Sequence, residues 1–193
     1  MGISKELLSQ TQEDSVYSQP TYDPESNLYH VPIVEGEFRT KGPLNVGFQI
    51  TRRCNLKCIY CSVDEDKRPV DFVIEKDYLA EEFKKLVEYK NIDGIEAHIA
   101  SQGEPMLYAP LADLIQDISK IKSVKTISID TNGCLLTKEK VDELVKAGLT
   151  RFNFSINAMD DKIAKKISGS SYDIKKIKEI CRHISKRARI IIA

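Results

Sequence analysis

Strand-like and helix-like residue patterns alternate along most of the chain, from Leu44 onward. Short apolar and β-branched runs predict five strands, over residues 44–50, 94–100, 124–130, 151–156 and 189–192. The second to fifth predicted strands begin about 27 to 38 residues apart, which is the length of a strand–helix–strand unit. Such units place neighbouring strands parallel with right-handed crossovers, so the sequence predicts an α/β fold built on one parallel sheet.

The segments between these strands carry apolar residues at helical spacing. Pro110 suits the first turn of one predicted helix, Thr137 suits the N-cap of the next, and Gly148 suits its C-terminal stop. The expected inward-facing helical residues are Leu79, Phe83, Leu86, Val87, Leu111, Leu114, Ile115, Ile118, Ile121, Val141, Leu144, Val145, Ile163, Ile167, Ile174, Ile177, Ile180 and Ile184.

The composition suits a soluble protein with a substantial core. Of the 193 residues, 41% are hydrophobic, and 29 basic residues balance 29 acidic ones, which disfavours a polycation that coats nucleic acid. No apolar run approaches the length of a membrane span, and the first residues contain no hydrophobic signal core. We therefore expect a cytoplasmic protein without membrane contact.

The first 40 residues differ in character from the rest. Pro20, Pro24 and Pro32 interrupt a mostly polar stretch in which only residues 29–34 resemble a short edge strand. We predict an irregular N-terminal extension over residues 1–40 and a folded core over residues 41–193. A flap that contacts substrate is the alternative to a loosely packed extension.

Polar residues follow each of the first four predicted strands. A cysteine-containing loop follows the first strand, Ser101–Pro105 follows the second, Asp130–Gly133 ends the third, and Ser155–Asn157 ends the fourth. Active sites of parallel α/β folds lie at the carboxyl ends of the strands. The sequence therefore predicts one functional site at this rim.

The loop after the first strand contains Cys54, Cys58 and Cys61 in a C-x3-C-x2-C run. Three thiolates can hold three irons of a [4Fe–4S] cluster and leave the fourth iron without a protein ligand. Clusters that only transfer electrons normally take four cysteines, whereas an incomplete protein shell is typical of a catalytic metal site. The run therefore favours chemistry at a cluster.

Other uses of these cysteines stay open. A zinc site would need a fourth ligand, and His30, His98 and His183 are the available histidines, none at a motif spacing. A disulfide framework suits small secreted chains. Unused thiols are a further alternative.

The chain resembles enzymes of the radical S-adenosylmethionine (radical SAM) superfamily, over about residues 44 to 157. Gln102 stands where the family usually has a glycine. The resemblance implies the family's fold, a partial TIM-type (β/α) barrel, which we expect here to be truncated after about five strands. The resemblance rests on the cysteine run with Tyr60 before its third cysteine, on Gly103-Glu104-Pro105, on Thr131-Asn132-Gly133, and on Ser155.

The resemblance implies that the three cysteines hold a [4Fe–4S] cluster whose open iron chelates the methionine amino and carboxylate groups of SAM. Tyr60 occupies the position of the family's adenine-contacting aromatic residue; core packing is its alternative. Gly103 lacks a β-carbon, which would let the main chain approach the methionine ammonium. Glu104 is the acidic member of the same motif.

Three more residues are expected at the cofactor by the same resemblance. Ser155 corresponds to a residue that binds the ribose or carboxylate of SAM, and a hydroxyl bonded to the main chain is the alternative. Asp130 and Thr131 resemble a segment of glycyl-radical activating enzymes, where a cation can lie near SAM. A structural turn is the alternative there, because Asn-Gly is a strong turn signal.

Two further cysteines and a histidine have less defined roles. Cys134 follows the Asn-Gly turn and could be a substrate-side thiol, an extra cluster ligand or a buried inert thiol. Cys181 is expected in the core, and His98 is expected to pack within its strand.

The resemblance implies reductive cleavage of SAM, with one electron from the reduced cluster, to a 5′-deoxyadenosyl radical that abstracts hydrogen from an unknown substrate. It also implies an external one-electron reductant of the ferredoxin or flavodoxin type. A non-catalytic iron–sulfur or zinc-binding module of the same fold is the competing prediction. Because the family core commonly has six units and residues 190–192 would leave an apolar edge, we expect a C-terminal remainder or partner chain.

Overall fold

The structure is a computed structural model that describes residues 21–23, 28–30, 45–61, 73–99, 102–170 and 172–192. The chain divides into two compact units, residues 1–39 and 40–193. In the first unit, β1 (Thr21–Asp23) pairs antiparallel with β2 (Leu28–His30). The strand predicted over residues 29–34 therefore overlaps β2, and its remainder lies outside the described residues.

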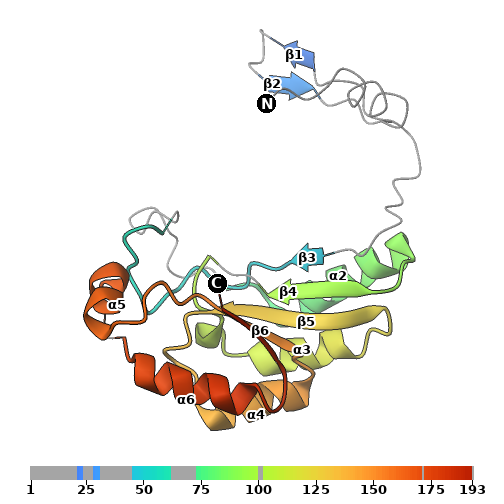
Figure 1. The fold of residues 1–193 in the computed structure, drawn as a ribbon. Helices are drawn as coiled ribbons and strands as arrows, with labels where there is room; N and C mark the ends of the chain where they lie inside the picture. The colour runs from blue at the N-terminus through green and yellow to red at the C-terminus, as the bar shows by residue number, and fades with distance from the viewer. Residues whose placement is uncertain are drawn as a thin grey trace, which may run out of the picture. The chain divides into compact units, whose positions relative to one another are not determined.

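A five-stranded parallel sheet forms the centre of the second unit (Figure 1). Its strands are β3 (Asn45–Gly47), β4 (Ile95–Ile99), β5 (Val124–Thr131), β6 (Arg151–Phe154) and β7 (Arg189–Ile192). The strands lie side by side in chain order, and each is parallel to the next. This confirms the predicted α/β class. The unreversed order is that of a (β/α) barrel, because a doubly wound sheet reverses its order at a switch point.

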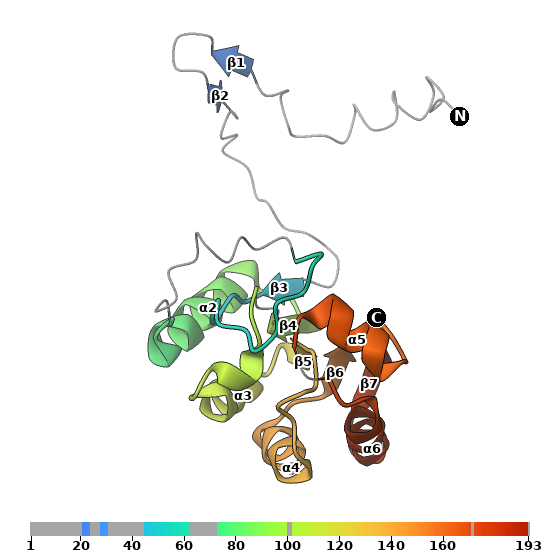
Figure 2. The ribbon, with the colours of Figure 1, turned by 90° about the vertical axis from the view of Figure 1, so that its left-hand side faces the viewer.

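Four helices cover one face of this sheet: α2 (Lys76–Lys90), α3 (Leu111–Ser119), α4 (Lys138–Ala147) and α6 (Ile174–Ile184). Figure 2, which faces the ends of the strands, shows them as an outer arc around the sheet. The short helix α5 (Asp161–Ser168) lies beyond the carboxyl ends of the strands, and a 3-10 turn, η2 (Pro105–Leu107), follows β4. In the described part of the chain, none of the helices combines the length and apolar character needed to cross a membrane.

Alternation along the strands separates an apolar face from a polar face. In β4, Ile95, Ala97 and Ile99 are buried, while Glu96 and His98 between them are half-buried. The buried residues belong to a core cluster shared with the helices, and each fully buried aliphatic side chain stabilises it by about 1.5–3 kcal/mol. We call the sheet surface that carries Glu96 and His98 the concave face.

Two helix predictions are confirmed at the level of single residues, and the expected inward orientation of Ile163 is wrong. The Thr137 side chain accepts a hydrogen bond from the Lys140 N–H at 3.2 Å, and Gly148 ends α4 with φ +118°. The apolar residues at helical spacing between residues 163 and 184 belong to two helices, α5 and α6, because Gly169 ends α5 with φ +64°. Ile163, expected to face inward, is 54% exposed, since α5 is outside the helix layer.

The first strand is shorter than predicted. Regular pairing covers Asn45–Gly47, and the Phe48 N–H still donates to the His98 carbonyl at 2.8 Å. The chain then leaves the sheet, and Thr51 pairs with Val73 in an isolated antiparallel bridge. This departure carries the following residues over the ends of the neighbouring strands.

The N-cap of α4 gives a direct test of the helix assignment. We expect Thr137→Ala to lower the free energy of unfolding by about 0.5–2 kcal/mol, because the Lys140 N–H loses its acceptor. Urea unfolding followed by circular dichroism measures the change. Thr137→Ser keeps the hydroxyl and is the matched control; equal losses in both variants would contradict the capping role.

Candidate functional site

A cavity of about 220 Å³ lies where the loops that follow the strands meet. Its walls come from residues 51–61, called the cysteine loop, from the loop after β4, from the end of β5, and from the segment between β6 and α6. The residues predicted for the site all line it: Cys54, Cys58, Tyr60, Cys61, Gly103, Glu104, Asp130, Thr131 and Ser155. The fold thus brings them together, while their roles toward a cofactor stay predictions.

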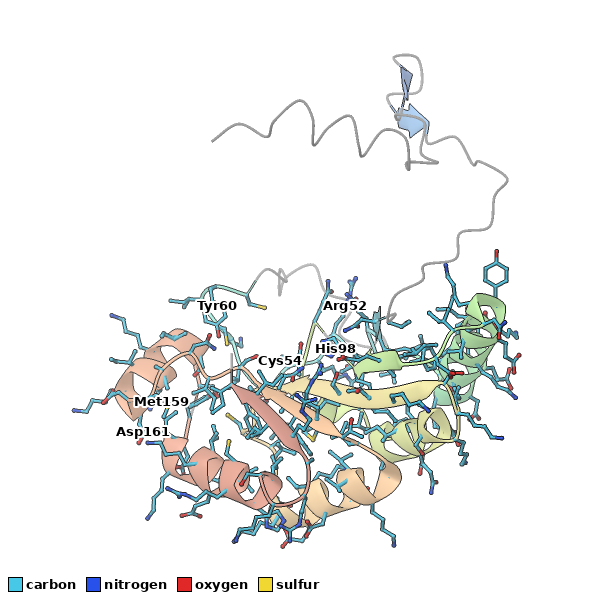
Figure 3. All side chains as sticks on the ribbon, turned by 45° about the vertical axis from the view of Figure 1, so that its right-hand side comes forward. Arg52, Cys54, Tyr60, His98, Met159 and Asp161 are labelled. Carbon is cyan, nitrogen blue, oxygen red and sulfur yellow. The ribbon has the colours of Figure 1, made fainter. Side chains whose placement is uncertain are left out.

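The cysteine loop presents three cysteine side chains to this cavity. Cys54 and Cys61 are exposed and Cys58 is half-buried, while Leu56 between them is buried and fixes the loop to the protein. The Cys61 N–H donates to the Cys58 carbonyl at 3.0 Å, which closes a tight turn between the last two cysteines. Figure 3 shows Cys54 and Tyr60 on the side of the sheet away from α4 and α6.

The arrangement of the thiols bears on what they could hold. Across residues 45–61, 73–99, 102–170 and 172–192, no three His, Cys, Asp or Glu side chains are gathered closely enough for a single metal ion. In an iron–sulfur cluster each cysteine binds its own iron, so the thiolates need not converge on one point. The lack of a closely gathered set among these residues therefore does not argue against the predicted cluster at the three cysteines, which line one cavity.

Gly103 allows the cysteine loop to dock on the loop after β4. A β-carbon at this position would lie 2.8 Å from the carbonyl carbons of Arg52 and Arg53, closer than such atoms can approach. The neighbouring Glu104 N–H donates to the Arg53 carbonyl at 2.8 Å. The space that the missing side chain frees is therefore filled by the cysteine loop, which is a nearer reason for a glycine here than an approaching ligand.

The carboxylate of Glu104 is buried and ties two loops together. Its Oε1 accepts hydrogen bonds from the Thr131 hydroxyl at 2.7 Å and the Met106 N–H at 3.2 Å. Its Oε2 accepts from the Asn132 N–H at 2.9 Å. Glu104 thus fixes the loop after β4 to the end of β5, and the Thr131 hydroxyl is one of the donors that hold it there.

The same carboxylate gives the cavity an electrostatic preference. Burial raises the pKa of Glu104, although its three hydrogen bonds act in the opposite direction. All three of these donors, from Thr131, Met106 and Asn132, are uncharged groups. A cationic ligand in the cavity would therefore offset the cost of burying this charge.

Asn132 is a site residue that the sequence marked only as part of a turn. Its side-chain Nδ2 donates to the Asn55 Oδ1 at 2.9 Å, and its Oδ1 accepts from the Cys134 N–H at 2.9 Å. Gly133 completes the turn with φ +75°. The expected structural turn is present, and it also holds the cysteine loop.

Tyr60 presents a neutral ring at the mouth of the cavity. The ring is 54% exposed, and its hydroxyl accepts a hydrogen bond from the Asn157 side chain. Partial burial, reinforced by neighbouring Cys58, raises the pKa of Tyr60 to about 12, so the phenol is protonated at neutral pH. The residue is therefore a flat, uncharged surface with a polar tip, not a core residue.

Tyr172 was missed by the sequence because no motif surrounds it between the two predicted helical stripes. Its hydroxyl lies 3.3 Å from the carbonyl oxygens of Asn132 and Ser155, to which it donates. Burial raises the pKa of Tyr172. This side chain lines the cavity and joins the ends of β5 and β6.

Asp130 links the cavity to the concave face. Its Oδ1 accepts a hydrogen bond from the Asn153 Nδ2 at 2.8 Å, and its Oδ2 lies 3.2 Å from the His98 Nε2. The other ring nitrogen of His98 is 2.7 Å from the Ser128 hydroxyl. His98, labelled in Figure 3 and expected only to pack within its strand, thus takes part in a polar network.

The network continues across three strands. The Ser128 hydroxyl donates to the Glu96 Oε1 at 2.8 Å, and Arg151 forms an ion pair with the same carboxylate. Arg151 Nε also donates to the Asn153 Oδ1 at 3.2 Å. A connected set of polar groups therefore runs from the cavity over the concave face.

Cys134 lies beside this site and lines a second cavity of about 520 Å³, which it shares with Tyr172 and Lys176. The Lys176 ammonium donates to the Cys134 carbonyl at 2.8 Å. Burial, followed by the charge of Glu104, raises the pKa of Cys134 to about 11. The thiol is therefore protonated at neutral pH. Cys181, expected in the core, is partly buried against it.

Comparison with known proteins places this site in a family context. A family model described as the Radical SAM superfamily matches residues 48–191. The chain is 46% identical over 148 residues to the protein MJ0103 of Methanocaldococcus jannaschii. The aligned region covers 72% of this chain and 34% of that protein. It is 34% identical over 132 residues to a GTP 3′,8-cyclase of Clostridium botulinum. This aligned region covers 66% of this chain and 39% of that enzyme. The chain thus spans well under half the length of these curated relatives.

Solved structures share the fold at low sequence identity. SuiB of Streptococcus suis bound to the precursor peptide SuiA matches with a TM-score of 0.63 and 21% identity, over 78% of this chain and 32% of that one. The enzyme anSMEcpe with bound AdoMet matches with a TM-score of 0.62 and 22% identity, over 78% and 44%. These likenesses support the predicted barrel-type α/β arrangement.

The buried carboxylate is tested by Glu104→Gln. An amide has one oxygen, so its NH2 group must face a donor that the carboxylate now accepts from. We expect the free energy of unfolding in urea to fall by about 1–3 kcal/mol. Glu88→Gln, at an exposed helical position, is the control and should change it by less than about 0.5 kcal/mol. Similar small losses in both variants would contradict the role of the Glu104 carboxylate in joining the loop after β4 to the end of β5.

The raised pKa of Cys134 predicts slow alkylation. A shift from 9.0 to about 11 lowers the thiolate fraction about 100-fold at pH 8, and the thiolate is the reactive form. Iodoacetamide labelling followed by peptide mass spectrometry should therefore be at least about 100-fold slower at Cys134 in the folded protein than in urea. Equal rates in the two states would show that the thiol is not held in its protonated form.

Proposed function

The chain belongs to the Radical SAM superfamily, and we propose that it forms the cluster- and SAM-binding part of a radical SAM enzyme. The proposal is carried by one observation: three cysteines line the same cavity as a buried carboxylate whose hydrogen-bond donors, the Thr131 hydroxyl and the Met106 and Asn132 N–H groups, are uncharged. Cys54, Cys58 and Cys61 would hold a [4Fe–4S] cluster. When bound, such a cluster supplies the electron that cleaves SAM reductively and yields the 5′-deoxyadenosyl radical that attacks a substrate.

The residues of the chain would bind and orient SAM. The Glu104 carboxylate favours a ligand that carries positive charge, and SAM carries both a sulfonium and an ammonium. The exposed ring of Tyr60 offers a flat surface suited to adenine. The hydroxyl of Ser155 and the side chains of Asp130 and Thr131, which line the same cavity, are proposed as further contacts.

The substrate is proposed to be polar. The network that starts at Asp130 continues over the concave face through His98, Ser128 and Glu96, so a substrate beside the cavity would meet hydrogen-bonding groups. Among the relatives, the clostridial enzyme is a GTP 3′,8-cyclase and SuiB was crystallised with a precursor peptide. Both kinds of molecule are polar.

Two partners are proposed with this function. A one-electron donor of the ferredoxin or flavodoxin type would reduce the cluster. A further segment, from the same polypeptide or from a partner chain, would cover the outer edge of the sheet, where Ile191 and Ile192 of β7 are 44% and 60% exposed.

Anaerobic reconstitution with iron and sulfide tests the proposal. We expect about four irons per chain, and 5′-deoxyadenosine after addition of SAM and dithionite. Cys54→Ala, Cys58→Ala and Cys61→Ala should each abolish the product, because each removes one ligand of the cluster. Cys181→Ala, which changes a cysteine outside the cavity, is the matched control and should retain it.

The outcomes separate the competing functions. Four irons with a spectrum that SAM leaves unchanged would indicate a non-catalytic iron–sulfur module. A colourless protein that binds zinc in place of iron would overturn the proposal altogether.

A further inference from the structure

The C-terminal end of α5 contacts the second half of the cysteine loop. The Lys57 N–H donates to the Ser168 carbonyl at 2.8 Å, and the Ile59 N–H donates to the Ile167 carbonyl at 3.0 Å. Carbonyls in the last turn of a helix have no partner within the helix. The cysteine loop therefore supplies donors that this helix end needs.

Gly169 lets the two segments approach each other. It ends α5 in the left-handed region, with φ +64°, and its N–H donates to the Lys165 carbonyl at 3.0 Å. A β-carbon at this position would lie 2.9 Å from the carbonyl oxygen of Lys57 and 3.1 Å from its Cβ. Both the backbone conformation and the contact with the cysteine loop therefore favour glycine.

These contacts bracket the middle cysteine. Lys57 and Ile59 are the neighbours of Cys58, and Cys61 is joined to Cys58 by the 3.0 Å hydrogen bond of the turn. The position of the second and third thiols thus depends on α5.

The first half of the loop has a different support. Arg53 accepts a hydrogen bond from the Glu104 N–H, and Asn55 accepts one from the Asn132 side chain, so this half is fixed to the loops after β4 and β5. The three thiols are therefore held by two separate anchors, one on the sheet and one on α5.

The helix α5 buries little apolar surface. Its buried residues are Ala164 and Ser168, whereas the core helix α3 buries two leucines and two isoleucines. A hydrogen bond from the Ile174 N–H to the Asp161 Oδ1, at 2.9 Å, joins α5 to the start of α6. A helix with so little buried apolar surface opens more easily than the core.

We propose that Gly169 is a positioning residue for the cluster. By letting the cysteine loop rest on the end of α5, it sets the main chain around Cys58 and hence the spacing between Cys54 and the other two thiols. This inference rests on the proposed function. It adds that a helix lacking any cluster ligand decides whether the ligands are correctly placed.

Gly169→Ala tests the inference, with Gly148→Ala as the matched control. Gly148 also ends a helix at positive φ, and a β-carbon there would lie 2.6 Å from the Cβ of Ser119, but this contact is between α3 and α4. Both substitutions introduce backbone strain and a close contact, so thermal unfolding should show a loss of stability in each. Only Gly169→Ala should disturb the cysteine loop.

The first measurement uses the protein without iron. Amide hydrogen exchange at Lys57 and Ile59 should become at least several-fold faster in Gly169→Ala and should stay unchanged in Gly148→Ala, because only the former displaces their acceptors. The second measurement uses reconstituted protein. Iron retention against a chelator should fall about 10-fold or more in Gly169→Ala, and SAM should no longer alter its electron paramagnetic resonance spectrum as in wild type.

Two results would overturn the inference. One is unchanged exchange at Lys57 and Ile59 together with wild-type iron retention in Gly169→Ala. The other is an equal loss of iron in both variants, which would show a general effect of stability. If the wild-type protein itself fails to take up four irons, the proposed function fails first, and the exchange data still report on the anchor.

Discussion

Glu104 joins three segments that are distant in the sequence. Its N–H holds the main chain of the cysteine loop at Arg53, and its carboxylate holds Thr131 and Asn132 at the end of β5. A buried carboxylate is costly unless its oxygens are bonded, so these contacts are mutually dependent. The walls of the cavity keep their relative positions because this one side chain needs all of its donors.

Much of this arrangement follows from patterns that the sequence displays. The spacing of the strands requires parallel neighbours, and parallel neighbours bring their carboxyl ends to one edge. Cys54, Glu104, Thr131 and Ser155 could therefore be assigned to one site before their contacts were known. The helix-capping roles of Thr137 and Gly148 could also be predicted, because a helix cap depends on a few local residues.

Features that depend on tertiary contact could not be predicted in this way. No sequence pattern indicated that the space beside Gly103 is filled by the main chain of Arg53. Tyr172 and His98 make polar contacts with residues 17 to 40 positions away in sequence, and no local sequence pattern predicts such pairs. Ile163 follows a helical stripe, yet it is exposed because its helix lies outside the layer that covers the sheet.

The buried charge of Glu104 also couples the cavity to the acidity of the solution. Because burial raises the pKa of this carboxyl group and a bound cation would lower it again, protons and a cationic ligand bound beside it would compete for the same oxygens. Thermodynamic linkage then requires that ligand binding release protons as the solution approaches the raised pKa. Affinity for a positively charged nucleoside such as SAM would accordingly weaken on acidification, even with every other contact intact.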